Sequence, residues 1–290
     1  MSLEKIIEKS KLAPNIHRIR FHLPLLVEKA KPGQFVILRI DEQGERIPMS
    51  IADLDKKNGI LTIVFQEVGK STAQLGSLKE GGSLSDVVGP LGTPTHIEKY
   101  GNCVCVGGGI GIAPIHPVAK ALREAGNYVT SIIGARNKEL LIMEEESRAS
   151  CDKLIVSTDD GSYGFHGFVT QVLAGMLEKS EKVDFVFSVG PVLMMRALSR
   201  VTLPYKVRTI ISLNPIMVDG TGMCGACRVT VGNQTKFACV DGPDFDAHLV
   251  DFEELLKRQR MYLKQEKVAM DIFVSGMEHS AHQHQTHEPA

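Results

Sequence analysis

An aspartate and three cysteines near the C-terminal end of the sequence have a spacing that can bind iron. Asp219 is followed by Cys224, Cys227 and Cys239, which gives the pattern D-x4-C-x2-C-x11-C. Plant-type two-iron clusters use C-x4-C-x2-C and a distant cysteine, and here a carboxylate, a harder anionic ligand, takes the first place. Neighbouring glycines let the backbone wrap closely and direct N–H groups at the sulfurs; they are Gly220, Gly222 and Gly225. The pattern favours a 2Fe–2S cluster with these four residues as its ligands.

Two other interpretations of the cysteines remain open at this point. Three cysteines together with His248 or Asp219 can close a tetrahedral structural zinc site. The cysteines can also be unrelated to any metal, because C-x2-C-x11-C alone is a weak pattern. The aspartate four places upstream and the flanking glycines make iron–sulfur binding the preferred hypothesis.

A glycine-rich segment follows the apolar run 102–108 and precedes a helix-like stretch. Its backbone N–H groups and the helix N-terminus can hold a pyrophosphate. A proline stands where the usual dinucleotide fingerprint has its third glycine, and proline suits the first turn of a helix. The alternative is a tight strand-to-helix turn without a ligand. The candidate nucleotide-binding residues are Gly107, Gly108, Gly109, Gly111, Ala113 and Pro114.

Two polar residues follow the next predicted strands. Arg136 ends the second strand, where an arginine can meet the 2′-phosphate of NADP or simply be solvated. Asp159 ends the third, at the sheet edge where ligands bind, so it is either part of the nicotinamide site or a solvated turn residue.

An arginine and a serine in the N-terminal third can bind a second cofactor. Arg46 and Ser50 are four residues apart on a predicted strand, so they share a face, where the arginine can hold a phosphate and the serine can donate to a ring nitrogen. A helix N-terminus at Gly69, Lys70, Ser71 and Thr72 is available to the same phosphate, with Ser71 or Thr72 as the N-cap.

The elements that would position these residues change in kind along the chain. Residues 1–97 hold short β-branched and aromatic runs separated by turn residues, which predict a small antiparallel β-barrel. Residues 98–212 alternate five continuous apolar strands with four helices, which is typical of a doubly wound parallel sheet. Residues 213–268 form a Gly- and Cys-rich module ending in a helix from Asp251, and 269–290 are expected to be a flexible tail.

Composition excludes several classes of protein. The 290 residues carry a net charge of −1, so there is no basic surface for nucleic acid or an anionic membrane. No apolar run reaches about 18 residues, and the charged N-terminus has no signal-like apolar core, which predicts a cytoplasmic protein. In that reducing compartment the six cysteines are ligands or core residues rather than disulfides.

These motifs, in this order, resemble the ferredoxin–NADP reductase superfamily, whose members join an FAD-binding barrel to a nucleotide-binding α/β domain. Residues 46–50 resemble its flavin motif in an R-x-P-x-S form, which adds Pro48 and Met49 to the implied FAD contacts, with Met49 in place of the family's tyrosine. Residues 107–114 resemble its G-G-G-x-G-x-A-P loop. Gly190 and Pro191, before two methionines, resemble its C-G-P-x-x-M segment.

The cysteine module narrows the resemblance to two groups of electron-transfer subunits. The closer one is the small subunit of NADH-dependent reduced ferredoxin:NADP⁺ oxidoreductase, because of Asp219 and the run 239–243. It implies FAD, a 2Fe–2S cluster and NAD(H), although Arg136 by itself points to NADP(H). It also implies a large flavin and 4Fe–4S partner subunit of the glutamate-synthase-small-subunit type. That partner bifurcates electrons, so ferredoxin is an indirect partner of this chain. No catalytic acid–base residue is expected.

Two alternative functions are retained. The first is the electron-transfer subunit of dihydroorotate dehydrogenase B, which expects Cys rather than Asp at 219. The second is a zinc-stabilised, non-catalytic nucleotide-binding protein.

Overall fold

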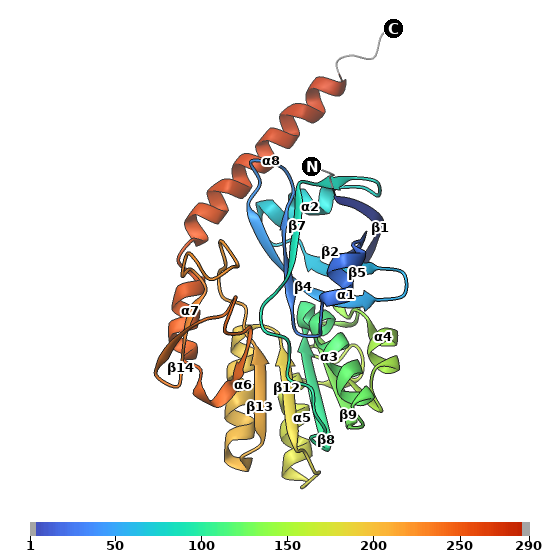
Figure 1. The fold of residues 1–290 in the computed structure, drawn as a ribbon, viewed down its shortest axis with the longest axis vertical. Coiled ribbons are helices and arrows are strands. Elements are labelled where there is room, and N and C mark those ends of the chain that lie inside the picture. The colour runs from blue at the N-terminus through green and yellow to red at the C-terminus, as the bar shows by residue number, and fades with distance from the viewer. Residues whose placement is uncertain (1–3, 286–290) are drawn as a thin grey trace.

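The computed structural model describes the backbone of residues 4–285 and the side chains of residues 4–275. The N-terminal part is a seven-stranded, entirely antiparallel sheet that curls into a barrel (Figure 1), with the strand order β6-β1-β2-β5-β4-β3-β7. This confirms the barrel predicted from the sequence. Its strands are β1 (Glu4–Ala13), β2 (Ile16–His22), β3 (Phe35–Arg39), β4 (Arg46–Asp55), β5 (Ile60–Gln66), β6 (Ser83–Leu84) and β7 (Asp86–Leu91).

Two short helices close the barrel, α1 (Pro24–Lys29) and α2 (Lys70–Ser77). The prediction that Ser71 or Thr72 caps α2 is wrong, because the helix begins at Lys70 and Gly69 is its N-cap. Thr72 instead lies in the first turn, where its hydroxyl accepts the Gly69 N–H at 3.1 Å. The barrel interior is apolar and includes Phe21 and Leu61, both fully buried.

The second part is a mostly parallel sheet with helices on both faces, as the alternating pattern predicted (Figure 1). Its strand order is β11-β10-β9-β8-β12-β13-β16. The five predicted strands are β8 (Asn102–Gly108), β9 (Tyr128–Ala135), β10 (Lys153–Thr158), β12 (Phe185–Val189) and β13 (Arg208–Ser212). The four predicted helices are α3 (Ile112–Glu124), α4 (Glu144–Ala149), α5 (Val169–Glu178) and α6 (Val192–Thr202).

Two edge strands of this sheet were not predicted. β11 (Phe165–His166) is too short to give a sequence signal, and it pairs parallel to β10. β16 (Asp244–Asp246) belongs to the C-terminal module and pairs antiparallel with β13. Short 3-10 turns occupy Gly109–Gly111, Lys138–Leu140, Leu203–Tyr205 and Ala247–Leu249.

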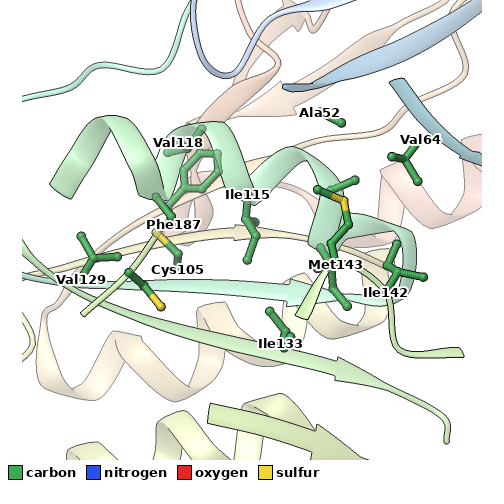
Figure 2. Close-up of a cluster of buried hydrophobic side chains, with 14 of the residues drawn as sticks. Ala52, Val64, Cys105, Ile115, Val118, Val129, Ile133, Ile142, Met143 and Phe187 are labelled. Atoms are coloured by element: carbon green, nitrogen blue, oxygen red, sulfur yellow. The ribbon is translucent and has the colours of Figure 1, made fainter. Parts of the chain in front are cut away.

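The barrel and the parallel sheet share one buried cluster. Figure 2 shows Ala52 of β4 and Val64 of β5 beside Ile142 and Met143, which belong to the α/β part. Val64 is 6% exposed and Ala52 is fully buried, so this junction is a continuous apolar core. Burial of this kind stabilises the relative placement of the two halves at about 25 cal/mol per Å² of apolar surface.

The C-terminal module consists of a hairpin, β14 (Arg228–Val231) and β15 (Gln234–Phe237), followed by β16 and two helices. The single helix expected from Asp251 is instead α7 (Phe252–Gln259) and α8 (Leu263–Gln285). Only α7 has an apolar face packed on the module, through Phe252 and Leu255, and the chain turns where that face ends.

The sequence predicts a flexible tail from residue 269, and in the structure α8 continues through residues 269–285. Residues 286–290 lie outside the described part of the chain. The helix contains no Pro and only one Gly, so nothing in its sequence breaks it. α8 leaves the module and passes beside α2 of the barrel (Figure 1). Within the described residues no helix is long and apolar enough to cross a membrane.

Candidate functional site

The glycine loop lies where the order of the parallel strands reverses. In the sheet, β9 lies beside β8 on one side and β10 lies beyond it. β12 lies beside β8 on the other side and β13 lies beyond it. Ligands of doubly wound sheets bind at such a switch point, outside the carboxyl ends of the strands. The loop 109–111 leads directly into α3, and Ala113 and Pro114 lie in the first turn of that helix. The predicted phosphate loop therefore has a helix N-terminus aimed at the switch point.

Two glycines let this loop approach the segment after β12. A Cβ atom on Gly111 would lie 2.2 Å from the Val189 carbonyl oxygen, and one on Gly108 would lie 2.4 Å from the Met194 sulfur. Gly190 is covered by the same methionine, since its Cβ would lie 2.5 Å from Met194 Cε. Gly109 has a φ of +56°, which glycine adopts without strain. The structure thus brings the 107–114 loop and the Gly190–Pro191 segment together, as one nucleotide site requires.

Arg136 and Asp159 also lie near one another at this edge of the sheet. The Asp159 N–H donates to the Ala135 carbonyl at 3.1 Å, and the Asp160 N–H donates to the Arg136 carbonyl at 3.2 Å. Partial burial raises the pKa of the Asp159 carboxyl, while the charge of Arg136 opposes this shift. Both side chains are exposed at the carboxyl ends of β9 and β10, so both are available to a nucleotide.

The candidate flavin residues divide between the two faces of β4. Arg46 and Ser50 are exposed and Pro48 is half-buried, and the period of two places all three on one face. Met49 points to the other face, where it is 8% exposed within the barrel core. The structure therefore separates Met49 from the other candidates, and Pro48 is the residue beside Arg46 and Ser50.

The N-terminus of α2 lies next to the start of β4. The Ser71 hydroxyl donates to the Glu45 carboxylate, one residue before Arg46. Lys70, Ser71 and Thr72 form the first turn, and a Cβ on Gly69 would have nothing within 4 Å. This side of the barrel thus presents a helix N-terminus beside an arginine, which suits a phosphate.

Asp219 is held as an anion at the start of the cysteine loop. Its Oδ2 atom accepts the Thr221 hydroxyl at 2.5 Å, the Thr221 N–H at 2.8 Å and the Met223 N–H at 3.3 Å. The hydrogen bonds from Thr221 are the main reason that the pKa of Asp219 is lowered, and the charge of Arg46 adds to them. The barrel's Arg46 therefore lies close enough to the cysteine loop to affect Asp219 electrostatically.

The three cysteines lie in two adjoining loops of the module. The Sγ atoms of Cys227 and Cys239 are 3.2 Å apart in the apolar interior, while Cys224 is exposed. The Ala226 N–H faces Cys224 Sγ at 3.4 Å. Burial and the neighbouring Cys227 thiol raise the pKa of Cys239 to about 12, and an N–H from Gly222 opposes this. Iron must displace that proton, since the thiolate is the ligand.

The close pair of Cys227 and Cys239 suits a two-iron cluster. Within the described residues, three or more His, Cys, Asp or Glu side chains do not converge on one metal position. A 2Fe–2S cluster shares its four ligands between two irons, so a close pair such as Cys227 and Cys239 is what it needs. His248 is engaged elsewhere, because its Nε2 atom is 2.9 Å from the Thr202 hydroxyl. All six cysteines are free, as expected.

Replacing Asp219 with alanine should weaken the cluster and spare the flavin. The change removes one anionic ligand at the exposed end of the loop, while the barrel face around Arg46 and Ser50 is unaltered. We expect a several-fold loss of iron and acid-labile sulfide at an unchanged flavin content, measured on the purified chain. Thr221→Val is the matched control, because it removes a hydrogen bond to Asp219 and leaves the carboxylate. An Asp219→Ala protein with a wild-type cluster spectrum would exclude Asp219 as a ligand.

A buried carboxyl group joins the module to the rest of the molecule. The Thr95 hydroxyl, in the connection between barrel and sheet, donates to Asp244 Oδ2 at 2.5 Å. Asp244 Oδ1 is inaccessible and has no hydrogen-bond partner among the described residues. Burial raises the pKa of Asp244 to about 6, although hydrogen bonds from Thr95 and Ser212 oppose the shift.

Asp244 should make the protein less stable as the pH rises. The unfolded carboxyl ionises near pH 3.8, whereas the folded one keeps its proton until about pH 6. Stability is therefore lost between these values and stays lost above pH 6. Asp244→Asn removes this effect, so its stability relative to wild type should improve by about 1 kcal/mol between pH 5 and pH 8. Thermal unfolding at the two pH values measures this, and an equal difference at both would contradict it.

Sequence reasoning missed the residues that join distant segments. Thr95 and Asp244 are separated by most of the chain, and Thr and Asp are common in loops, so neither carried a signal. Arg258 was also missed; its Nη2 atom donates to the Ala226 carbonyl at 2.9 Å, between two of the cysteines. Its place in the last turn of α7 was the only available indication.

The cysteine module matches a known family of iron–sulfur domains. Residues 214–251 match the iron–sulfur cluster binding domain of dihydroorotate dehydrogenase B, which favours iron–sulfur over structural zinc. The fold is shared with the ferredoxin reductase of carbazole 1,9a-dioxygenase, at 20% identity and a TM-score of 0.59 over 71% of this chain and 66% of that chain. Fold and site together define a ferredoxin reductase-like oxidoreductase that carries an iron–sulfur domain.

Relatives that are similar over most of the chain identify the family. A dihydroorotate dehydrogenase B (NAD⁺) electron transfer subunit homolog from Thermotoga maritima is 49% identical over 273 residues, 94% of this chain and 96% of that protein. The electron transfer subunit from Bacillus caldolyticus is 37% identical over 233 residues, 77% of this chain and 88% of that protein. The chain therefore belongs to the family of dihydroorotate dehydrogenase B electron transfer subunits and their homologues.

One solved structure is similar over almost the whole chain. It is a structure of NADH-dependent reduced ferredoxin–NADP oxidoreductase, described for its insights into flavin-based electron bifurcation. The match has 47% identity and a TM-score of 0.89, and it covers 94% of this chain and 99% of that chain.

Proposed function

We propose that this chain is the FAD and 2Fe–2S electron-transfer subunit of an electron-bifurcating NADH-dependent reduced ferredoxin:NADP⁺ oxidoreductase. The likeness in sequence and fold to a structure of that enzyme, over 94% of the chain, is the observation that carries the proposal. The aspartate at the first ligand position supports it, because the dihydroorotate alternative expects a cysteine there.

The residues present fit the three groups that this function needs. Arg46, Pro48 and Ser50 on β4, with the N-terminus of α2, would hold FAD. The loops 107–114 and 190–191 would hold NAD(H), and Arg136 leaves NADP(H) as a possible ligand. Cys227 and Cys239 would bind one iron, and Asp219 and Cys224 the other. When bound, FAD supplies two-electron hydride chemistry and the cluster supplies one-electron transfer.

The chain's own side chains position these groups and exclude water. The buried cluster formed by both halves fixes the barrel against the switch point. A Cβ on Gly220 would lie 2.9 Å from Ile37 of the barrel, so the ligand loop packs directly on β3. The charge of Arg46 contributes to the lowered pKa of Asp219, which supports a flavin face close to the ligand loop. These contacts between the three parts support the order nucleotide, flavin, cluster.

The relatives' names describe an electron transfer subunit of a larger assembly, and we propose that the partner here is a large flavin and 4Fe–4S subunit. We expect it to belong to the glutamate-synthase-small-subunit type and to pass electrons to ferredoxin. We also propose a cytoplasmic location, where a reducing environment keeps cysteines free.

Anaerobic purification of the chain from its own cells tests this function. Mass spectrometry should find a large flavin and iron–sulfur partner, and the complex should reduce ferredoxin and NAD⁺ together from NADPH. The purified chain should contain flavin, iron and acid-labile sulfide and should oxidise NADH with a dye. A colourless, flavin-free chain would overturn the proposal.

Dihydroorotate oxidation is the second candidate, favoured by the family match of residues 214–251. Under it the same purification would yield a smaller flavoprotein that oxidises dihydroorotate. The fold and the cofactor sites would be unaffected, and only the partner and the electron donor would change.

A further inference from the structure

An arginine from α7 reaches into the loop between two cysteines. Arg258 Nη2 donates to the Ala226 carbonyl at 2.9 Å, and Ala226 lies between Cys224 and Cys227. The helix that carries Arg258 is fixed in place. Asp251 caps it by accepting the Glu254 N–H at 2.9 Å.

The apolar face of α7 strengthens this placement. Phe252 is 8% exposed and Leu255 is 1% exposed, and both pack in the same cluster as Cys227 and Cys239. The guanidinium of Arg258 and the two buried thiols are thus held by one rigid unit. A mobile surface arginine would not have this constraint.

A second arginine acts on the neighbouring peptide group. Arg228 Nη1 lies 3.4 Å from the Gly225 carbonyl oxygen. That carbonyl shares its peptide group with the Ala226 N–H, which faces Cys224 Sγ at 3.4 Å. A cation at the oxygen end of a peptide strengthens the donor at its nitrogen end. Arg228 therefore polarises the peptide group whose N–H faces Cys224, in the sense that favours negative charge on that sulfur. Arg258 binds the next carbonyl of the same loop and adds its positive charge there.

Neither arginine is paired with a carboxylate within the described side chains. Both line a cavity of about 210 Å³ that also exposes Cys224, and no Asp or Glu belongs to its lining. An unpaired cation beside a metal group favours the form of that group with the additional electron.

We propose that Arg258, assisted by Arg228, is a positioning residue that fixes the Cys224–Cys227 loop and raises the reduction potential of the cluster held there. The inference rests on the proposed function, since it requires a 2Fe–2S cluster on Asp219, Cys224, Cys227 and Cys239. Hydrogen bonding to the sulfurs, net charge and solvent exposure are the general determinants of such potentials.

A potentiometric titration of the anaerobically purified chain tests this, followed by visible absorption and electron paramagnetic resonance. Arg258→Gln should lower the midpoint potential of the cluster. The ratio of reduced to oxidised cluster at a fixed potential should fall on the order of tenfold, which is about 59 mV for one electron. Arg258→Lys keeps the charge and should recover most of the shift. Arg228→Gln should shift the potential in the same direction by a smaller amount.

Arg260→Gln is the matched control. It removes an exposed arginine from the end of the same helix. Within the described part of the chain, no hydrogen bond or ion pair joins the Arg260 side chain to the loop. The proposal is overturned if Arg258→Gln keeps the wild-type potential, or if Arg260→Gln shifts it equally. Loss of iron from Arg258→Gln with flavin retained, and recovery in Arg258→Lys, would support the positioning role. If the Arg258→Gln protein loses flavin as well, the cluster potential of the Arg228→Gln protein becomes the test, because Arg228 is exposed. An unchanged potential in the Arg228→Gln protein overturns the proposal. A wild-type chain without iron would instead contradict the proposed function.

Discussion

Replacing Gly111 with alanine should raise the KM for NADH at least tenfold. The new Cβ would lie 2.2 Å from the Val189 carbonyl oxygen and 2.9 Å from Gly190 Cα. Both neighbours are backbone atoms, so neither can rotate away as a side chain would. The loop before α3 and the segment after β12 must then separate, at the switch point where both would contact the nucleotide. A misplacement of about 1 Å in such a site can cost about a hundredfold in rate.

NADH-dependent dye reduction measures this effect, and flavin content shows whether the barrel is intact. Gly175→Ala is the control, since a Cβ there would have nothing within 4 Å and Gly175 lies inside α5. It should leave KM unchanged and stabilise the protein by about 0.5–1 kcal/mol. A Gly111→Ala protein that is folded and has the wild-type KM would show that the loop does not bind the nucleotide.

Replacing Cys239 with serine should remove most of the iron and leave the flavin bound. Cys239 is 2% exposed, and its sulfur lies 3.2 Å from that of Cys227, so the two thiols form one buried pair. A serine hydroxyl is a harder donor and much less readily ionised than a thiol, which makes it a poor substitute for a thiolate on iron. Iron and acid-labile sulfide should fall several-fold, while dye reduction through the flavin continues.

Cys103→Ser is the matched control for this change. Cys103 is equally buried, at 1% exposed, but it lies on β8 among the core residues of the parallel sheet. Burial raises the pKa of its thiol to about 12, so it behaves as a small apolar residue. Its replacement should lower the melting temperature and retain the iron. Equal iron loss in both variants would mean that the Cys239 effect is one of stability.

Local sequence patterns predicted strands, helices and loops correctly where the residues involved are neighbours both in the chain and in space. Continuous apolar runs predicted five parallel strands, which are β8, β9, β10, β12 and β13. Glycines predicted the loop into α3. It was harder to predict which β4 side chains point outward and which point into the barrel, because a motif match does not give their direction. The alternation along β4 places Pro48 with Arg46 and Ser50, and it turns Met49 into the barrel.

Contacts between distant segments could not be read from the sequence. The three residues of β16 show no strand signal, and they form a strand because the edge of β13 offers unpaired backbone groups. Arg258 looks like any helix-end arginine until the fold places it at the Ala226 carbonyl. Asp244 becomes unusual only because the fold buries it beside Thr95.

The pairing of β16 with β13 determines which parts of the protein unfold together. The chain leaves the parallel sheet after Ser212, forms the cysteine loops, and returns at Asp244, where the Leu213 N–H donates to the Pro243 carbonyl at 2.9 Å. The cysteine-bearing segment 213–243 is therefore joined to the nucleotide-binding sheet at both of its ends. Opening it requires the sheet to lose an edge strand, so the iron site and the nucleotide site belong to one cooperative unit. Heat should release their ligands in a single transition.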